Sequence, residues 1–352
     1  MKQSMGEIRF GCFLPVPSTP TEKLLTIAKV NEGAGFDSIW APDHLLFIPP
    51  GIVPEAWSTL SAIAVVTEKS ILGSCVSDPH RHHPAVLAQM VATVDRISGG
   101  RTILGLGAGE AMNLDPFGMK WNMPVSRLVE AVSIIRKLWS GSILDFEGRF
   151  WKLSNAFLQI APTKGSVPIY LGANSPRTLR LTGEVADGWL STPLTPRLYR
   201  KRVDIVKNGA KKVGRSPDEL DMGVYLYTSI ADQSEEAYTQ IEKMKIQTVA
   251  SPQLLQEAGY NVELPKEMES LSYFKATLAS EWMEKLLAYG ELIPREAAIE
   301  FSIAGTVEDC IDKIEEFIKA GVRHLILVNV GPDPRQVMRL YSEKIIPHFK
   351  SE

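Results

Sequence analysis

The chain has 352 residues, of which 45% are hydrophobic and 22% are charged, so it can bury one large core or two ordinary ones. Its net charge of -3 gives no electrostatic case for nucleic acid as a partner. No apolar run is long enough for a signal peptide or for the ~20 residues of a membrane span, so we expect a cytoplasmic protein with no membrane partner.

Short apolar segments alternate with amphipathic helical segments along the chain. Strands are expected at residues 8–14, 37–40, 71–76, 167–171, 188–190, 222–230 and 324–329, with one more in the apolar run before Gly105. Helices are expected at 21–35, 57–67, 84–98, 124–139, 196–213, 306–320 and 334–346, and Thr21, Ser234 and Thr306 are candidate capping residues.

Two segments interrupt this alternation. Residues 140–163 suggest a small surface hairpin, and residues 251–297 look like a helical insertion between the seventh and eighth strands. Eight strands, one insertion and no linker match a (β/α)8 TIM barrel, with residues 1–352 as a single domain, better than an open sheet. A functional site is then expected at the carboxyl ends of the strands.

Three glycines at alternate positions, Gly105, Gly107 and Gly109, follow the fourth strand and lead into Glu110. Such spacing allows a flat ligand to approach the backbone. A nicotinamide-binding turn is the competing interpretation, but it requires a helix that begins at the loop, and none is expected before Pro124. An ordinary turn is the third possibility.

His44 follows the second strand, so it should face the same mouth of the barrel as Glu110. An imidazole can exchange a proton near neutral pH, and a nearby carboxylate can orient it. The alternative is a loop histidine bonded to backbone.

A metal site is not expected. Arg81 interrupts the histidine cluster of His80, His82 and His83, and loop histidines of this kind are usually solvated. The three cysteines lie far apart, with no C-x-x-C pair, at Cys12, Cys75 and Cys310.

The turn from Asn174 to Thr178 is a candidate phosphate site. Free amides at a helix start, the hydroxyls of Ser175 and Thr178 and the guanidinium of Arg177 could converge there. An ordinary helix cap would carry the same residues.

Several motifs together resemble the luciferase-like flavin and deazaflavin oxidoreductases, specifically the branch that uses coenzyme F420. They are SIWAPDH (38–44), the segment LGSCVSDPHRHHP to LGLGAGEAMN (72–113), FGMKWNMPVSRLVEAVSIIRKLW (117–139), NSPRTLRLTGEVADGW (174–189) and FSIAGTVEDCIDKIEEFIKAGVRHLIL (301–327). The set looks closest to phthiodiolone ketoreductases and methylenetetrahydromethanopterin reductases.

The resemblance implies a role for individual residues. Asp43 and His44 would lie beside the deazaflavin ring, with His44 as proton donor or acceptor and Glu110 as its acidic partner. Cys75 and Val76 would form a non-prolyl cis peptide behind the ring. Other positions that would contact the cofactor are Ser77, Asp78, Ala108, Gly109 and Asn113. The phosphate in the tail of the cofactor would be bound by Asn174, Ser175, Arg177 and Thr178.

The implied activity is hydride transfer between coenzyme F420 and a small molecule of the alcohol or ketone type, by a homodimer. The methylene-pterin reductases carry a glutamate at the end of the first strand where this chain has Phe13 and Leu14. The related sugar-phosphate dehydrogenases carry a lysine near the position of Thr195. Open alternatives are a methylene-pterin reductase, a monooxygenase that uses flavin mononucleotide (FMN), and a barrel that stores or senses the deazaflavin.

Overall fold

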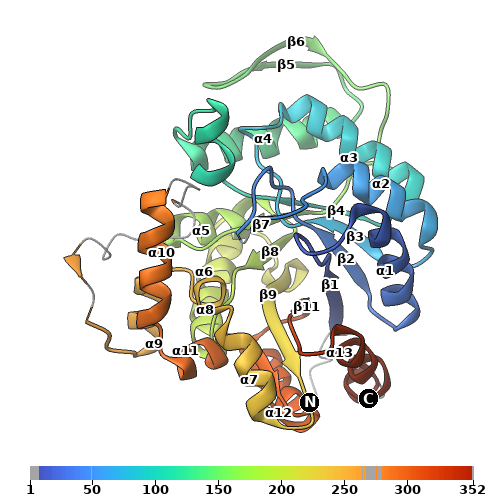
Figure 1. Cartoon of the computed structure of the whole chain (residues 1–352). Helices are drawn as coiled ribbons and strands as arrows, with labels where there is room; N and C mark the ends of the chain where they lie inside the picture. Colours follow the sequence, from blue (N-terminus) through green and yellow to red (C-terminus); the bar gives the residue numbers. More distant parts are fainter. Residues whose placement is uncertain (1–7, 49, 264, 267–274, 276–279, 351–352) are drawn as a thin grey trace.

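The computed structural model describes residues 8–350 apart from 49, 264, 267–274 and 276–279 (Figure 1). Eight parallel strands form a closed barrel, because β11 pairs with both β9 and β1. In order around the barrel the strands are β1 (Arg9–Phe13), β2 (Ser38–Ala41), β3 (Ile71–Ser74), β4 (Thr102–Leu106), β7 (Ile169–Gly172), β8 (Gly188–Ser191), β9 (Asp221–Ile230) and β11 (His324–Asn329). The expected TIM barrel is confirmed.

Helices surround the strands (Figure 1). They are α1 (Thr21–Gly33), α2 (Ala56–Val66), α3 (Pro84–Ser98), α4 (Pro124–Trp139), α5 (Pro176–Val185), α6 (Pro196–Lys212), α7 (Ser234–Glu242), α12 (Val307–Ala320) and α13 (Pro334–Leu340). The last of these continues through a π-helical turn (Tyr341–Ile345) into α14 (Ile346–Lys350). Among the described residues, no helix has the length and apolar character needed to cross a bilayer.

Of the three apolar clusters among the described residues, two form the layers of the barrel itself. The larger one packs the outer faces of the strands against the helices, with side chains such as Leu87 and Val91 of α3 fully buried. The smaller one fills the barrel and draws one side chain from each of six strands: Phe13, Trp40, Ile103, Tyr170, Leu190 and Ile326. The barrel is therefore a packed core, and a ligand must bind at one of its ends.

Both interruptions of the barrel pattern are present. The expected hairpin consists of antiparallel β5 (Leu144–Glu147) and β6 (Lys152–Ala156). The insertion lies between the seventh and eighth barrel strands, as expected, although part of 251–297 falls outside the described residues. Its described helices are α9 (Pro252–Ala258), α10 (Ser280–Leu292) and α11 (Arg295–Glu300). The insertion is preceded by α8 (Lys245–Thr248) and followed by a short strand, β10 (Ile303–Gly305), that extends the sheet beside the end of β9.

Some local expectations were wrong. The third strand ends at Ser74, before the Cys75–Val76 peptide, so the last two residues of the apolar run form a bulge. Thr21 and Ser234 are the first residues of their helices and do not cap them. Thr306 does cap α12, in a reciprocal capping box with Asp309.

Candidate functional site

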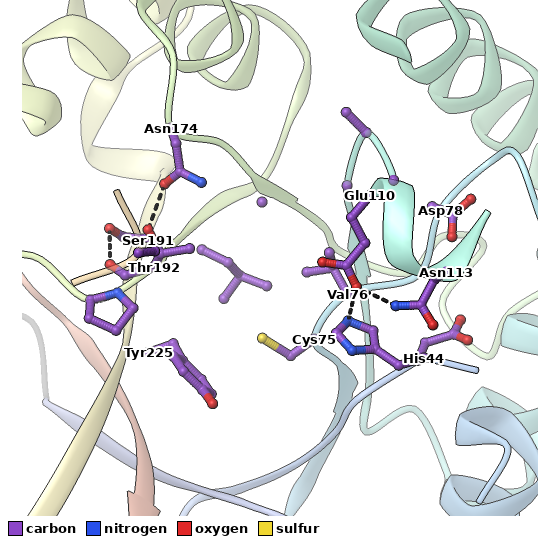
Figure 2. Close-up of a pocket in the computed structure, with 18 of the residues that line it drawn as sticks. His44, Cys75, Val76, Asp78, Glu110, Asn113, Asn174, Ser191, Thr192 and Tyr225 are labelled. Carbon is purple, nitrogen blue, oxygen red and sulfur yellow. Dashed lines mark hydrogen bonds and ion pairs between the residues drawn. The ribbon is translucent and has the colours of Figure 1, made fainter. Parts of the chain in front are cut away.

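A cavity of about 360 Å³ opens among the carboxyl ends of the barrel strands (Figure 2). All the residues expected at the site line this cavity except Ser77 and Arg177. The segments that carry them are far apart in the sequence, and closure of the barrel brings them together.

His44 and Glu110 form a pair on one wall (Figure 2). The imidazole Nε2 lies 3.3 Å from Glu110 Oε1, and the two side chains are 19% and 11% exposed. The second ring nitrogen, Nδ1, is buried without a hydrogen-bond partner among the described residues. Because an unpaired buried nitrogen is unfavourable, His44 Nδ1 is suited to a polar atom of a ligand.

Arg81 joins the two acidic residues of the adjacent wall. Its Nε donates to Asp78 Oδ2 at 2.5 Å, one terminal nitrogen donates to Asp43 Oδ1 at 2.8 Å, and the other donates to the Asp43 backbone oxygen. Burial alone raises the pKa of Asp43, but the hydrogen bond with His82 and the charge of Arg81 outweigh it and hold that pKa well below its usual range. Arg81 therefore fixes the residue that precedes His44.

Only one member of the histidine cluster, His83, is exposed as expected, whereas His80 and His82 are partly buried. His82 Nε2 lies 3.0 Å from Asp43 Oδ2, and the His82 side chain is 16% exposed. In the part of the chain that the structure describes, no three histidine, cysteine or acidic side chains are arranged to hold a metal ion.

The peptide between Cys75 and Val76 is cis, which confirms the resemblance at this point. Two of the alternate glycines, Gly107 and Gly109, line the cavity, and close approach of a flat ligand there stays a prediction. A Cβ on Gly105 would lie 1.9 Å from the Ser74 carbonyl oxygen, and one on Gly107 would lie 2.6 Å from Val76 Cγ2. These two glycines thus make room for the neighbouring bulge, and the bulge itself forms the cavity surface. Burial raises the pKa of the Cys75 thiol to about 12.

The turn from Asn174 to Thr178 begins α5 at the opposite side of the cavity. Ser175 and Thr178 cap the helix reciprocally, and Asn174 Oδ1 accepts from the Thr192 hydroxyl at 2.9 Å (Figure 2). Arg177 is exposed and lies off the cavity wall. Asn174, Ser175 and Thr178 line the cavity and Arg177 does not, so the turn forms a helix cap and its role as a phosphate site stays a prediction.

Ser77 is fully buried beside the bulge and accepts from Trp57 Nε1 at 3.0 Å. This contact gives Ser77 a role in packing the loop after β3 against α2. Its assignment to the cofactor site was implied by the resemblance and stays a prediction.

An aromatic wall was missed by sequence reasoning. Phe13, Phe47, Tyr225 and Tyr227 line the cavity, with the Tyr225 hydroxyl donating to that of Tyr227 at 3.1 Å. Trp121 also lines it and donates from Nε1 to the Ala108 oxygen at 2.9 Å. The alternate tyrosines of β9 were the available signal, because alternate residues of a barrel strand point to the same side.

Comparison with known proteins agrees with this architecture. The chain is 31% identical to the 5,10-methylenetetrahydromethanopterin reductase of Methanopyrus kandleri, over 98% of this chain and 100% of that protein. It is 31% identical to the F420-dependent glucose-6-phosphate dehydrogenase of Microbacterium testaceum, over 97% and 98% of the two chains.

A solved structure of an F420-dependent secondary alcohol dehydrogenase, in complex with an F420-acetone adduct, superposes with a TM-score of 0.82 at 26% identity. It covers 96% of this chain and 98% of that one. The family model described as luciferase-like monooxygenase matches residues 8–324. The chain therefore belongs to the luciferase-like family.

Proposed function

We propose that this protein is a coenzyme F420-dependent oxidoreductase that transfers a hydride between the deazaflavin and an alcohol or ketone. The observation that carries the proposal is the His44–Glu110 pair on the wall of a cavity that aromatic side chains also line. The F420-dependent relatives, which match over nearly the whole chain, support the choice of cofactor.

The cavity has features that fit a flat, polar-edged cofactor. The Cys75–Val76 bulge offers an apolar surface, and Ala108 and Gly109 border it. Asn174 and the first turn of α5 would face the phosphate end, with helix amides as donors. When bound, a deazaflavin supplies two-electron hydride chemistry, because carbon replaces the flavin nitrogen that supports radical reactions.

His44 is placed to move the proton that accompanies hydride transfer. An alcohol that loses a hydride must also lose its hydroxyl proton. If Nε2 donates its hydrogen to Glu110, Nδ1 carries a lone pair that can accept this proton. The Glu110 carboxylate then stabilises the imidazolium, and the reverse reaction returns the proton from Nδ1 to the ketone oxygen.

The lining favours an uncharged substrate. Arg81 is the only lysine or arginine among the described residues that line the cavity, and its guanidinium is already paired with the carboxylates of Asp43 and Asp78. Thr195, near the position of a lysine in the sugar-phosphate dehydrogenases, caps α6 through its side chain. A phosphorylated sugar would therefore find no free cation there.

A methylene-pterin reductase is the second candidate, because the match to the Methanopyrus kandleri reductase spans that whole protein. Hydride transfer to an iminium carbon has less need of a proton at Nδ1. The two candidates thus differ in their expected dependence on His44.

The experiment is a binding titration followed by a substrate screen. Purified protein is titrated with F420 and with FMN, and then assayed at 420 nm with alcohols plus oxidised F420 and with ketones or methylene-pterins plus reduced F420. We expect at least tenfold tighter binding of F420 and turnover with a secondary alcohol or ketone. Tighter binding of FMN with oxygen consumption would favour the monooxygenase, and cofactor binding without any turnover would favour a storage protein.

A further inference from the structure

The carboxamide of Asn113 connects the two loops that carry the proposed catalytic pair. Its Oδ1 accepts from the backbone amides of Leu45 and Leu46 at 2.6 and 2.7 Å, directly after His44. Its Nδ2 donates to Glu110 Oε1, the same oxygen that faces His44 Nε2 (Figure 2). One side chain thus holds both the loop after β2 and the carboxylate after β4.

The hydrogen-bonding capacity of Asn113 is almost fully used inside the protein. A carboxamide has two oxygen lone pairs and two N–H groups, and these contacts take both lone pairs and one hydrogen. The residue is 1% exposed although it borders the cavity. The orientation is also determined, because a flipped amide would point N–H groups at two backbone amides and its oxygen at a carboxylate.

We propose that Asn113 is a positioning residue for the His44–Glu110 pair, and that it acts through these two loops rather than as a cofactor ligand. The proposal rests on the proposed function for its link to catalysis. The hydrogen bond from Asn113 Nδ2 holds Glu110 Oε1 in a position where it can accept a hydrogen bond from His44 Nε2. The acceptor Oδ1 fixes the backbone that follows His44, so the distance between the two catalytic side chains is set by one amide.

The ionised side chains of the adjacent wall are partnered with one another, whereas Asn113 hydrogen-bonds Glu110 directly. On the adjacent wall Arg81 pairs with Asp43 and Asp78, and His82 contacts Asp43. His80, which lines the loop near Gly109, carries a pKa lowered by burial.

Two substitutions separate the functions of the carboxamide. Asn113→Asp keeps an acceptor for Leu45 and Leu46 but places a carboxylate against Glu110 in place of a donor. Two facing carboxylates share a proton more readily at low pH, and a protonated carboxyl can donate as the amide does. The ratio of variant to wild-type kcat should therefore rise about tenfold between pH 8 and pH 5.5, with the F420 dissociation constant changed less than about threefold.

Asn113→Ala removes both contacts. In the ligand-free protein, hydrogen exchange at the Leu45 and Leu46 amides should accelerate at least about tenfold, whereas Asn113→Asp should keep them near wild-type protection. The matched control is Asn155→Asp, which introduces the same charge at an exposed position of β6. It should change neither exchange nor the pH profile.

The outcomes distinguish this proposal from the proposed function. Unchanged exchange in Asn113→Ala would show that the loop tether is absent. A tenfold loss of F420 affinity in Asn113→Asp, with a pH profile parallel to wild type, would make Asn113 a direct cofactor ligand and overturn the positioning role. If wild-type protein bound no F420 while the exchange results held, the cofactor assignment would fail and the tether would stand.

Discussion

Removal of the Arg81 guanidinium tests how the cavity wall is held together. The Arg81 side chain is 8% exposed and lies between Asp43 and Asp78, whose side chains are 3% and 5% exposed. Arg81→Met would leave two buried carboxylates without their shared cation. Breaking a buried ion pair in this way costs about 3–5 kcal/mol of the free energy of unfolding, a large share of the 5–15 kcal/mol typical of a domain.

The pH dependence of this loss follows from Asp43. Its pKa is depressed in the folded protein, so its stabilising contribution is present above the unfolded value of about 4 and is lost as pH falls through the folded value. Without the guanidinium the Asp43 carboxyl takes up a proton at higher pH. The difference in unfolding free energy between variant and wild type should therefore be largest near pH 7 and should narrow towards pH 4.

Urea unfolding followed by tryptophan fluorescence between pH 4 and pH 8 measures both effects. Lys152→Met is the control, because its pair with Glu147 is 75% and 81% exposed and should contribute less than about 1 kcal/mol. Arg81→Lys keeps the charge but not the planar fork, and should give an intermediate loss if Arg81→Met does not fold. A loss in Arg81→Met no larger than in the control, or one that is constant with pH, would refute the reasoning.

Three further predictions follow from the site and its surroundings. His44→Asn should lower single-turnover hydride transfer by about 10²–10⁴ with F420 affinity within about threefold, and a wild-type rate would favour the methylene-pterin reductase. Gly107→Ala should weaken F420 binding about tenfold or more in a titration, because its Cβ would lie 2.6 Å from Val76 Cγ2, whereas Gly33→Ala, with nothing within 4 Å, should not. Although burial opposes it, amide donors lower the pKa of the partly exposed Glu32 to about 2, so Glu32→Gln should lose about 1 kcal/mol in urea unfolding at pH 7. That difference should shrink below pH 4.5, and a constant difference would assign it to another contact.

The barrel could be predicted because its signals are local. Helices α3 and α4 begin at Pro84 and Pro124, and α3 ends before a glycine in the left-handed conformation at Gly99. Proline at the first turn and glycine after the last are short-range rules that hold in any tertiary context. The regular alternation of such helices with buried strands then left few topologies other than a barrel.

The detailed site could not be derived from local rules, because the closure of the barrel decides which atoms meet. Gly107 lines the cavity, but only its three-dimensional neighbours show that a side chain there would collide with Val76. Asn113 contacts the amide of Leu45 across 68 positions of sequence, and no spacing rule links the two. The exposed side chain of Arg177 depends on the direction in which α5 leaves its strand, which the sequence of the turn does not encode.

The same barrel holds another histidine–carboxylate arrangement, around His324, and burial separates its role from that of the His44–Glu110 pair. His324 is 0% exposed, and its Nε2 lies 2.7 Å from Ser38 Oγ while its Nδ1 lies 3.3 Å from Asp221 Oδ2. Ser38 Oγ also accepts from Trp40 Nε1 at 2.8 Å, so this serine–histidine–aspartate series is internally paired and has no route to a substrate. His44 instead lines the cavity with one nitrogen left unpartnered among the described residues. Since a histidine can exchange a proton with a substrate only through a nitrogen that the protein leaves available, the His324 arrangement serves stability and the His44–Glu110 pair can serve chemistry.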